Sequence, residues 1–212
     1  MLKYAPQADK SRIRECVESI PRQLSKEHKK FAYATVRPNG RGREYQGSLQ
    51  WIEDAGIIRR CYNLSAPELP LDGNAIPDQF KVYMADTGLF ISMLEQGTAA
   101  DILQGNLYGY KGAIFENLVA DIFGKMNRKL YYFRKDSGLE IDFVTRYEGE
   151  CTLVEVKASN GNIKSAKTIL SNPEKYHVVQ AIKLGDVNVG TAPRTLILPL
   201  YMAFLLKTDN LR

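Results

Sequence analysis

Two carboxylates and a lysine stand at the ends of two apolar segments in the second half of the chain. Glu155 and Lys157 end the segment Thr152–Lys157, and in a strand they would share one face because side chains alternate. Asp142 lies in the preceding segment, separated from Glu155 by twelve residues. If the two strands are neighbours, the carboxylates of Asp142 and Glu155 converge, and their repulsion drives one of them toward protonation.

A bound divalent cation would relieve this repulsion. Carboxylate oxygens are the hard ligands that Mg²⁺ prefers, and Mn²⁺ is an alternative, so Asp142 and Glu155 are candidate metal ligands. Lys157 would stand near the metal, where it could orient water or stabilise charge that develops on a phosphate. Glu116, on the helix that precedes these strands, could supply a third carboxylate.

Two further polar residues are candidate accessory groups. Alternation along Glu140–Thr145 places Glu140 and Asp142 on one face and Ile141 and Phe143 on the other. Gln180 interrupts the apolar segment His177–Lys183. Alternatively, the acidic and basic residues form ordinary ion pairs on exposed edge strands, worth less than about 1 kcal/mol each. The apolar Leu153, Val154 and Val156 favour a central strand, and therefore a site.

The elements that would position these residues follow from hydrophobic periodicity and turn signals. Helices are expected at Asp9–Ile20, Glu44–Ala55, Asp86–Gln96, Thr98–Gln104, Tyr110–Met126, Ile163–Leu170 and Tyr201–Leu206. Strands are expected at Ile57–Leu64, Phe80–Met84, Lys129–Arg134, Glu140–Thr145, Thr152–Lys157, His177–Lys183 and Thr195–Leu198. The order helix, three strands, helix, strand in the second half predicts an α/β fold with helices on both faces of the sheet.

The first third has the element order of a winged helix: helix, turn, helix and a two-stranded wing. Pro21 is expected to end the first helix or to open the next element. The helix Glu44–Ala55 takes the recognition position, yet it carries Glu53 and Asp54 and few bases. A winged helix that contacts protein is therefore at least as well supported as one that enters the major groove.

Positive charge is concentrated in this first third. Residues 1–60 hold 13 Lys and Arg against 7 Asp and Glu, whereas residues 61–212 hold 16 against 17. This asymmetry suggests contact with a nucleic acid, although a solvated basic face explains it equally well. The candidate nucleic-acid-binding residues are Lys29, Lys30, Arg37, Arg41 and Arg43.

The set Asp142, Glu155-Val156-Lys157 and Glu116 resembles the PD-(D/E)xK nuclease superfamily. The resemblance implies a restriction-endonuclease-like mixed sheet flanked by helices, with Asp142 and Glu155 as metal ligands, Lys157 as the catalytic lysine and Glu116 as an accessory acid. Ile141 precedes Asp142 where the superfamily usually has proline. This departure leaves open a catalytically inactive module that binds nucleic acid or a protein partner.

The chain as a whole resembles the C-terminal region of a family of prokaryotic AAA-type ATPases. The resemblance is carried by SIPRQLSKEHKKFAY (19–33), REYQGSLQWIEDAGII (43–58), FKVYMADTGLF (80–90), GAIFENLVA (112–120), SGLEIDFV (137–144) and LVEVKA (153–158). It implies an ATPase module upstream and a winged-helix-like segment before the nuclease-like domain. The chain lacks the phosphate-binding pattern GxxxxGK[ST], so we expect no ATP hydrolysis from it, either as a fragment or as a separately encoded half.

These considerations predict a winged-helix-like domain at residues 1–90, a helical connector at 91–107 and a nuclease-like domain at 108–212. The expected activity is Mg²⁺-dependent hydrolysis of DNA, and the expected partners are DNA, the upstream ATPase and a second copy of the chain. A third alternative is an assembly domain that docks through the apolar tail Tyr201–Leu206. No apolar run reaches about 18 residues, no signal peptide is evident, and Cys16, Cys61 and Cys151 form no CxxC motif, so we expect a cytoplasmic protein without membrane contact.

Overall fold

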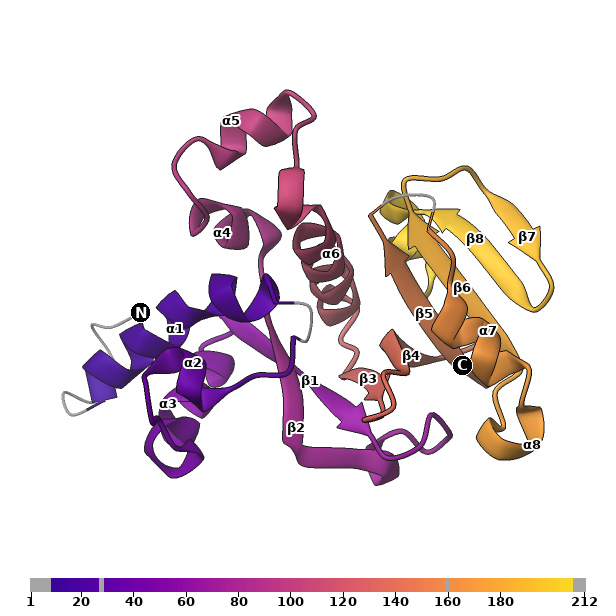
Figure 1. Ribbon diagram of the computed structural model, residues 1–212, viewed down its shortest axis with the longest axis horizontal. Coiled ribbons are helices and arrows are strands. Elements are labelled where there is room, and N and C mark those ends of the chain that lie inside the picture. Colours follow the sequence, from indigo (N-terminus) through magenta and orange to yellow (C-terminus); the bar gives the residue numbers. More distant parts are fainter. Residues whose placement is uncertain (1–8, 27–28, 159–160, 208–212) are drawn as a thin grey trace.

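The computed structural model describes residues 9–26, 29–158 and 161–207 (Figure 1). One mixed sheet of eight strands runs through this part of the chain, in the order β2-β1-β3-β4-β5-β6-β8-β7. The strands are β1 Ile58–Leu64, β2 Ala75–Met84, β3 Leu130–Arg134, β4 Glu140–Tyr147, β5 Glu150–Lys157, β6 Gln180–Gly185, β7 Gly190–Ala192 and β8 Thr195–Pro199. The α-helices are α1 Lys10–Leu24, α2 Tyr33–Val36, α3 Gly42–Asp54, α4 Thr87–Ser92, α5 Thr98–Leu103, α6 Lys111–Lys125, α7 Lys164–Leu170 and α8 Pro173–Tyr176.

Helices cover both faces of the sheet, which confirms the predicted fold class of a mixed α/β sheet preceded by a helical part. The helix α6 and the 3-10 helix Leu200–Leu205 pack on one face, and α7 packs on the other against β4 and β6. Each face has its own core of buried apolar side chains. Figure 1 shows α1 to α3 gathered at the β1–β2 end of the sheet, with α7 and α8 at the β5–β6 end.

The sheet joins the two halves of the chain. Strands β1 and β2 pair antiparallel, as a wing would, but β1 also pairs in parallel with β3 through Cys61–Leu64 and Leu130–Phe133. The wing strands are therefore part of the main sheet and do not form a free ribbon. The predicted boundaries at residues 90 and 108 stay a prediction, although the sheet and its core extend across them.

The helix α1 continues through Pro21 to Leu24, so the expected end at the proline is wrong. A proline inside a helix removes one backbone hydrogen bond, and packing must compensate for this loss. Ile20, Gln23 and Leu24 are buried, and the Gln23 side chain exchanges two hydrogen bonds with the backbone of Ala32, at 2.9 and 3.1 Å. These tertiary contacts carry the helix one turn beyond the proline.

The strands β4 and β5 form a tight hairpin, because only Glu148 and Gly149 lie between Tyr147 and Glu150. Both loop residues have positive φ, 51° and 83°, as a two-residue turn that matches the strand twist requires. The hairpin holds the two strands in register, so that residues near the start of β4 lie opposite residues near the end of β5. Among the described residues, no helix has the length and apolarity needed to cross a membrane.

Candidate functional site

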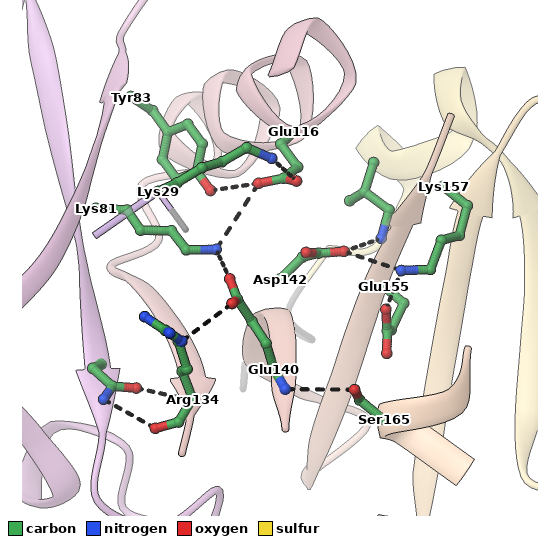
Figure 2. A network of polar contacts seen from close by, with 12 residues as sticks. Lys29, Lys81, Tyr83, Glu116, Arg134, Glu140, Asp142, Glu155, Lys157 and Ser165 are labelled. Carbon is green, nitrogen blue, oxygen red and sulfur yellow. Dashed lines mark hydrogen bonds and ion pairs between the residues drawn. The ribbon is translucent and has the colours of Figure 1, made fainter. Parts of the chain in front are cut away.

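Asp142, Glu155 and Lys157 meet at the open end of the β4–β5 hairpin, away from its turn (Figure 2). The Lys157 ammonium lies 2.5 Å from Oε2 of Glu155 and 3.9 Å from Oδ2 of Asp142. The Glu155 side chain is only 3% exposed, that of Asp142 is 13% exposed and that of Lys157 is 27% exposed. Solvent therefore reaches this group mainly from the side of Lys157.

The alternation predicted for β5 is confirmed. Val154 and Val156 join the core beneath α6, whereas Leu153 joins the core beneath α7, so Glu155 and Lys157 lie on the α7 side. The backbone N–H of Ala166 in α7 donates a hydrogen bond of 3.2 Å to Oε1 of Glu155. This bond, together with the ion pair to Lys157, satisfies both oxygens of a buried carboxylate.

The alternation predicted for the start of β4 is wrong. Ile141 packs in the core beneath α7, and Phe143 packs against Tyr83 and Phe123 in the core on the other side. The cause is a bulge in the pairing of β4 with β3. Val144 pairs with Tyr131 and Ile141 pairs with Phe133, so β4 advances by three residues where β3 advances by two. Such a bulge redirects side chains, and here Oδ2 of Asp142 accepts a 2.7 Å hydrogen bond from the N–H of Val156.

Glu116 is buried on α6 and is held by residues from the first half of the chain. Oε2 of Glu116 accepts a 3.0 Å hydrogen bond from the hydroxyl of Tyr83 and lies 4.0 Å from the ammonium of Lys81. Oε1 pairs with the ammonium of Lys29. Figure 2 shows Glu116 above Asp142, with its carboxylate directed toward these partners.

Lys81 is the central residue of this polar cluster that sequence reasoning missed. Its side chain is 1% exposed, and its ammonium lies 2.8 Å from Oε1 of Glu140 and 4.8 Å from the centre of the Tyr132 ring. Arg134 approaches the other oxygen of Glu140 at 3.5 Å. A signal was present in the sequence, because Lys81 is the one charged residue in the strongly apolar segment FKVYM.

The pKa values of two carboxylates in the cluster are shifted in opposite directions. Burial, together with the charges of Glu116 and Glu155, raises the pKa of Asp142 to about 7 against the opposing effects of Lys81 and Lys157. Burial would also raise the pKa of Glu116, but Lys81, Lys29 and the Tyr83 hydroxyl hold it below its ordinary value. Asp142 is therefore the carboxylate on which a proton, or a cation that replaces it, would be held near neutral pH.

The donor set suits a hard cation in part. Asp142 and Glu155 offer oxygen ligands, and their mutual repulsion is of the kind that a divalent ion relieves. Within residues 9–26, 29–158 and 161–207, however, no three His, Cys, Asp or Glu side chains lie close enough to form a metal-binding group. The third predicted carboxylate, Glu116, is engaged by Lys29 and Lys81.

The two accessory candidates have different positions. Glu140 belongs to the cluster, since it pairs with Lys81 and Arg134, and its backbone N–H donates to Oγ of Ser165 at 3.4 Å. Gln180 does not belong to it. Its side-chain amide donates to Tyr147 O at 3.1 Å and to Thr152 Oγ1 at 2.8 Å, at the opposite end of β5 from Lys157.

The candidate nucleic-acid-binding residues of the first third are also divided. Lys29 is half-buried and is directed at Glu116, so it belongs to the carboxylate cluster. The other four are exposed before α2, after α2 and at the start of α3: Lys30, Arg37, Arg41 and Arg43. They form a basic stretch of surface around α2 and the α2–α3 connection.

Comparison with known protein families finds two matching domain models, which cover successive parts of the chain. Residues 1–100 match the model of a domain of unknown function (DUF8612), and residues 111–201 match the model of another domain of unknown function (DUF4143). Domains of the second kind are commonly associated with the C-terminal regions of AAA ATPases. No curated protein and no solved structure matches the chain.

Proposed function

We propose that this chain is the nuclease-like C-terminal part of an AAA-type ATPase and hydrolyses phosphodiester bonds in DNA with the help of Mg²⁺ or Mn²⁺. The observation that carries the proposal is the meeting of Asp142, Glu155 and Lys157, with the lysine on the exposed side. Two buried carboxylates beside one accessible ammonium are a combination that can hold a cation and a phosphate together.

Asp142 and Glu155 would hold the ion. When bound, the ion would polarise a phosphoryl oxygen and make a coordinated water more acidic. Ion pairing with the two carboxylates raises the pKa of Lys157 against the effect of its burial, so this side chain remains a cation at neutral pH. It is then able to donate hydrogen bonds to the charge that develops on the phosphate, while Glu116 would act as an accessory acid behind Asp142.

A second candidate function is a catalytically inactive module that binds nucleic acid or a protein partner and positions the ATPase. It is favoured by the pairing of Glu116, Glu140 and Glu155 with lysines of the same chain. Carboxylates neutralised in this way need no metal for stability. The replacement of the usual proline by Ile141 points in the same direction.

Calorimetric titration with Mn²⁺ and with Mg²⁺ separates the two candidates. Wild type is compared with Asp142→Asn and Glu155→Gln, which remove a ligand charge and keep the shape of the side chain. Glu150→Gln is the matched control, because Glu150 is exposed at the other end of β5. Binding of one or two ions that is lost in the two site variants and kept in the control supports the metal site.

Cleavage of labelled DNA then tests the reaction. We expect Lys157→Ala to lower the cleavage rate by about 10²–10³-fold, the cost of removing one donor to a developing charge. Asp142→Asn should abolish cleavage. Equal, negligible metal binding in wild type and variants, with and without DNA, would exclude the hydrolytic function and leave the inactive module.

A further inference from the structure

A cavity of about 770 Å³ lies between α7, β6 and the β7–β8 hairpin. Its polar lining includes the cations Lys167, Lys183 and Arg194, and no Asp or Glu is among the residues that line it. Apolar side chains such as Ile163 and Leu170 form much of the remaining wall. The volume falls within the range typical of ligand sites, and the charge favours an anion.

The cavity adjoins the candidate active site. In the parallel register of β5, β6 and β8, Glu155 lies opposite Lys183, and Lys183 lies opposite Ile197, which also lines the cavity. Residues that pair across neighbouring strands point to the same face of a sheet, so Glu155, Lys183 and Ile197 form a row that leads from the candidate site into the cavity. The helix α7 contacts both, since Ala166 binds Glu155 and Lys167 lines the cavity wall.

Its cations are available to a ligand. Neither Lys167 nor Lys183 has a salt bridge to any Asp or Glu of the described residues. Lys183 is half-buried on the Glu155 side, whereas Lys167 and Arg194 are exposed at the rim. The Arg194 guanidinium is anchored by a 3.0 Å hydrogen bond to Leu170 O, and its backbone has φ of 55°, a conformation that few non-glycine residues adopt.

We infer that this cavity binds one nucleotide of a single nucleic-acid strand, next to the phosphate that the candidate site would cleave. An unstacked base would enter between the apolar side chains, and its flanking phosphates would contact Lys183 on one side and Lys167 on the other. A concave site with apolar walls and a basic rim suits a splayed base, which a paired duplex does not offer. This inference rests on the proposed function for the identity of the neighbouring phosphate, but the binding itself does not require catalysis.

Fluorescence anisotropy with a labelled single-stranded oligonucleotide, in chelator and without metal, tests the binding alone. Each of Lys167→Ala and Lys183→Met should weaken affinity about fivefold near 0.1 M salt and reduce the slope of log affinity against log salt by about 0.7, as expected for one lost phosphate contact. Lys164→Ala is the matched control, since Lys164 is exposed on the same helix and does not line the cavity. Equal affinities for the control and the two cavity variants would overturn the inference.

A variant that fills the cavity without changing its charge tests the place of the base. Ala192 lines the cavity from the edge strand β7, and Ala192→Phe should weaken single-strand binding while leaving the salt slope unchanged. Wild-type affinity in this variant would exclude a base in the cavity. Cavity-dependent binding without cleavage would leave the inference standing and defeat the proposed hydrolysis, whereas cleavage with cavity-independent binding would do the reverse.

Discussion

The ammonium group of Lys81 lies in the protein core, where an unpaired charge would be strongly unfavourable. Its position between Glu116 and Glu140 raises its pKa despite a large opposing effect of burial. The lysine in turn lowers the pKa of Glu116 and limits the rise in the pKa of Asp142. At the scale of single residues, one lysine from the first half of the chain therefore lowers the pKa of two carboxylates in the second half.

Replacing Lys81 by methionine should destabilise the protein by about 3–5 kcal/mol, the cost of leaving buried carboxylates without their counter-charge. Urea denaturation measures the change. Lys129→Met is the matched control, because Lys129 pairs with Asp72 on the surface, where the loss should be at most about 1 kcal/mol. The double variant Lys81→Met with Glu116→Gln should recover part of the lost stability, and a double variant no more stable than Lys81→Met alone would contradict the coupling.

At the scale of elements, the site depends on the close approach of β5 and β6. Gly185 at the end of β6 lies opposite Lys157, and a Cβ atom at this position would stand 2.7 Å from the carbonyl oxygen of Lys157. Backbone cannot yield as a flexible side chain can, so the strands would have to separate at the point where Glu155 and Lys157 are presented. Glycine at 185 thus links strand spacing to site geometry.

Gly185→Ala should cost about 1–3 kcal/mol of stability, in the range of other overpacking substitutions. Thermal unfolding measures the change, and Gly190→Ala is the control, since a Cβ at Gly190 on the edge strand β7 would meet nothing within 4 Å. We expect the control to change stability by no more than about 0.5 kcal/mol. Equal effects of the two substitutions would show that the contact with Lys157 does not limit the strand spacing.

At the scale of the whole molecule, the first third and the second half share one sheet and residues of both its cores. Parallel pairing joins β1 to β3, and the core beneath α6 contains residues of α1, α3, β2 and β5 together. The Glu116 cluster is itself built across this junction, because Lys29 and Lys81 come from the first half of the chain. Such continuity favours unfolding of the two parts as one cooperative unit.

Two local probes test this cooperativity. Trp51, the one tryptophan of the chain, reports on α3 by fluorescence, and hydrogen exchange of the peptide Glu150–Lys157 reports on β5. With increasing urea, both should reveal the same free energy of unfolding and the same dependence on denaturant. If α3 lost its structure at clearly lower urea than β5, the two parts would instead be independent domains.

The sequence by itself determined most of the helices and strands and, within the site, the common face of Glu155 and Lys157. Periods of 3.6 and 2 located the long helices and the main strands, and alternation in β5 correctly paired Glu155 with Lys157, because these patterns depend on local geometry and on burial. The short elements α2, α8 and β7 lacked a pattern long enough to detect. The metal, the DNA and the ATPase partner stay predictions.

Tertiary structure alone decided how these pieces meet. The bulge that places Ile141 and Phe143 on opposite faces of the sheet arises from the pairing of β4 with β3, and the residue pattern within β4 does not reveal it. Likewise, the charge of Lys81 becomes a part of the site only because β2 joins the sheet through β1 and places the lysine against Glu116 and Glu140. Contacts between segments far apart in the chain have no local signature, since they follow from sheet order and from the free-energy cost of burying a charge without a partner.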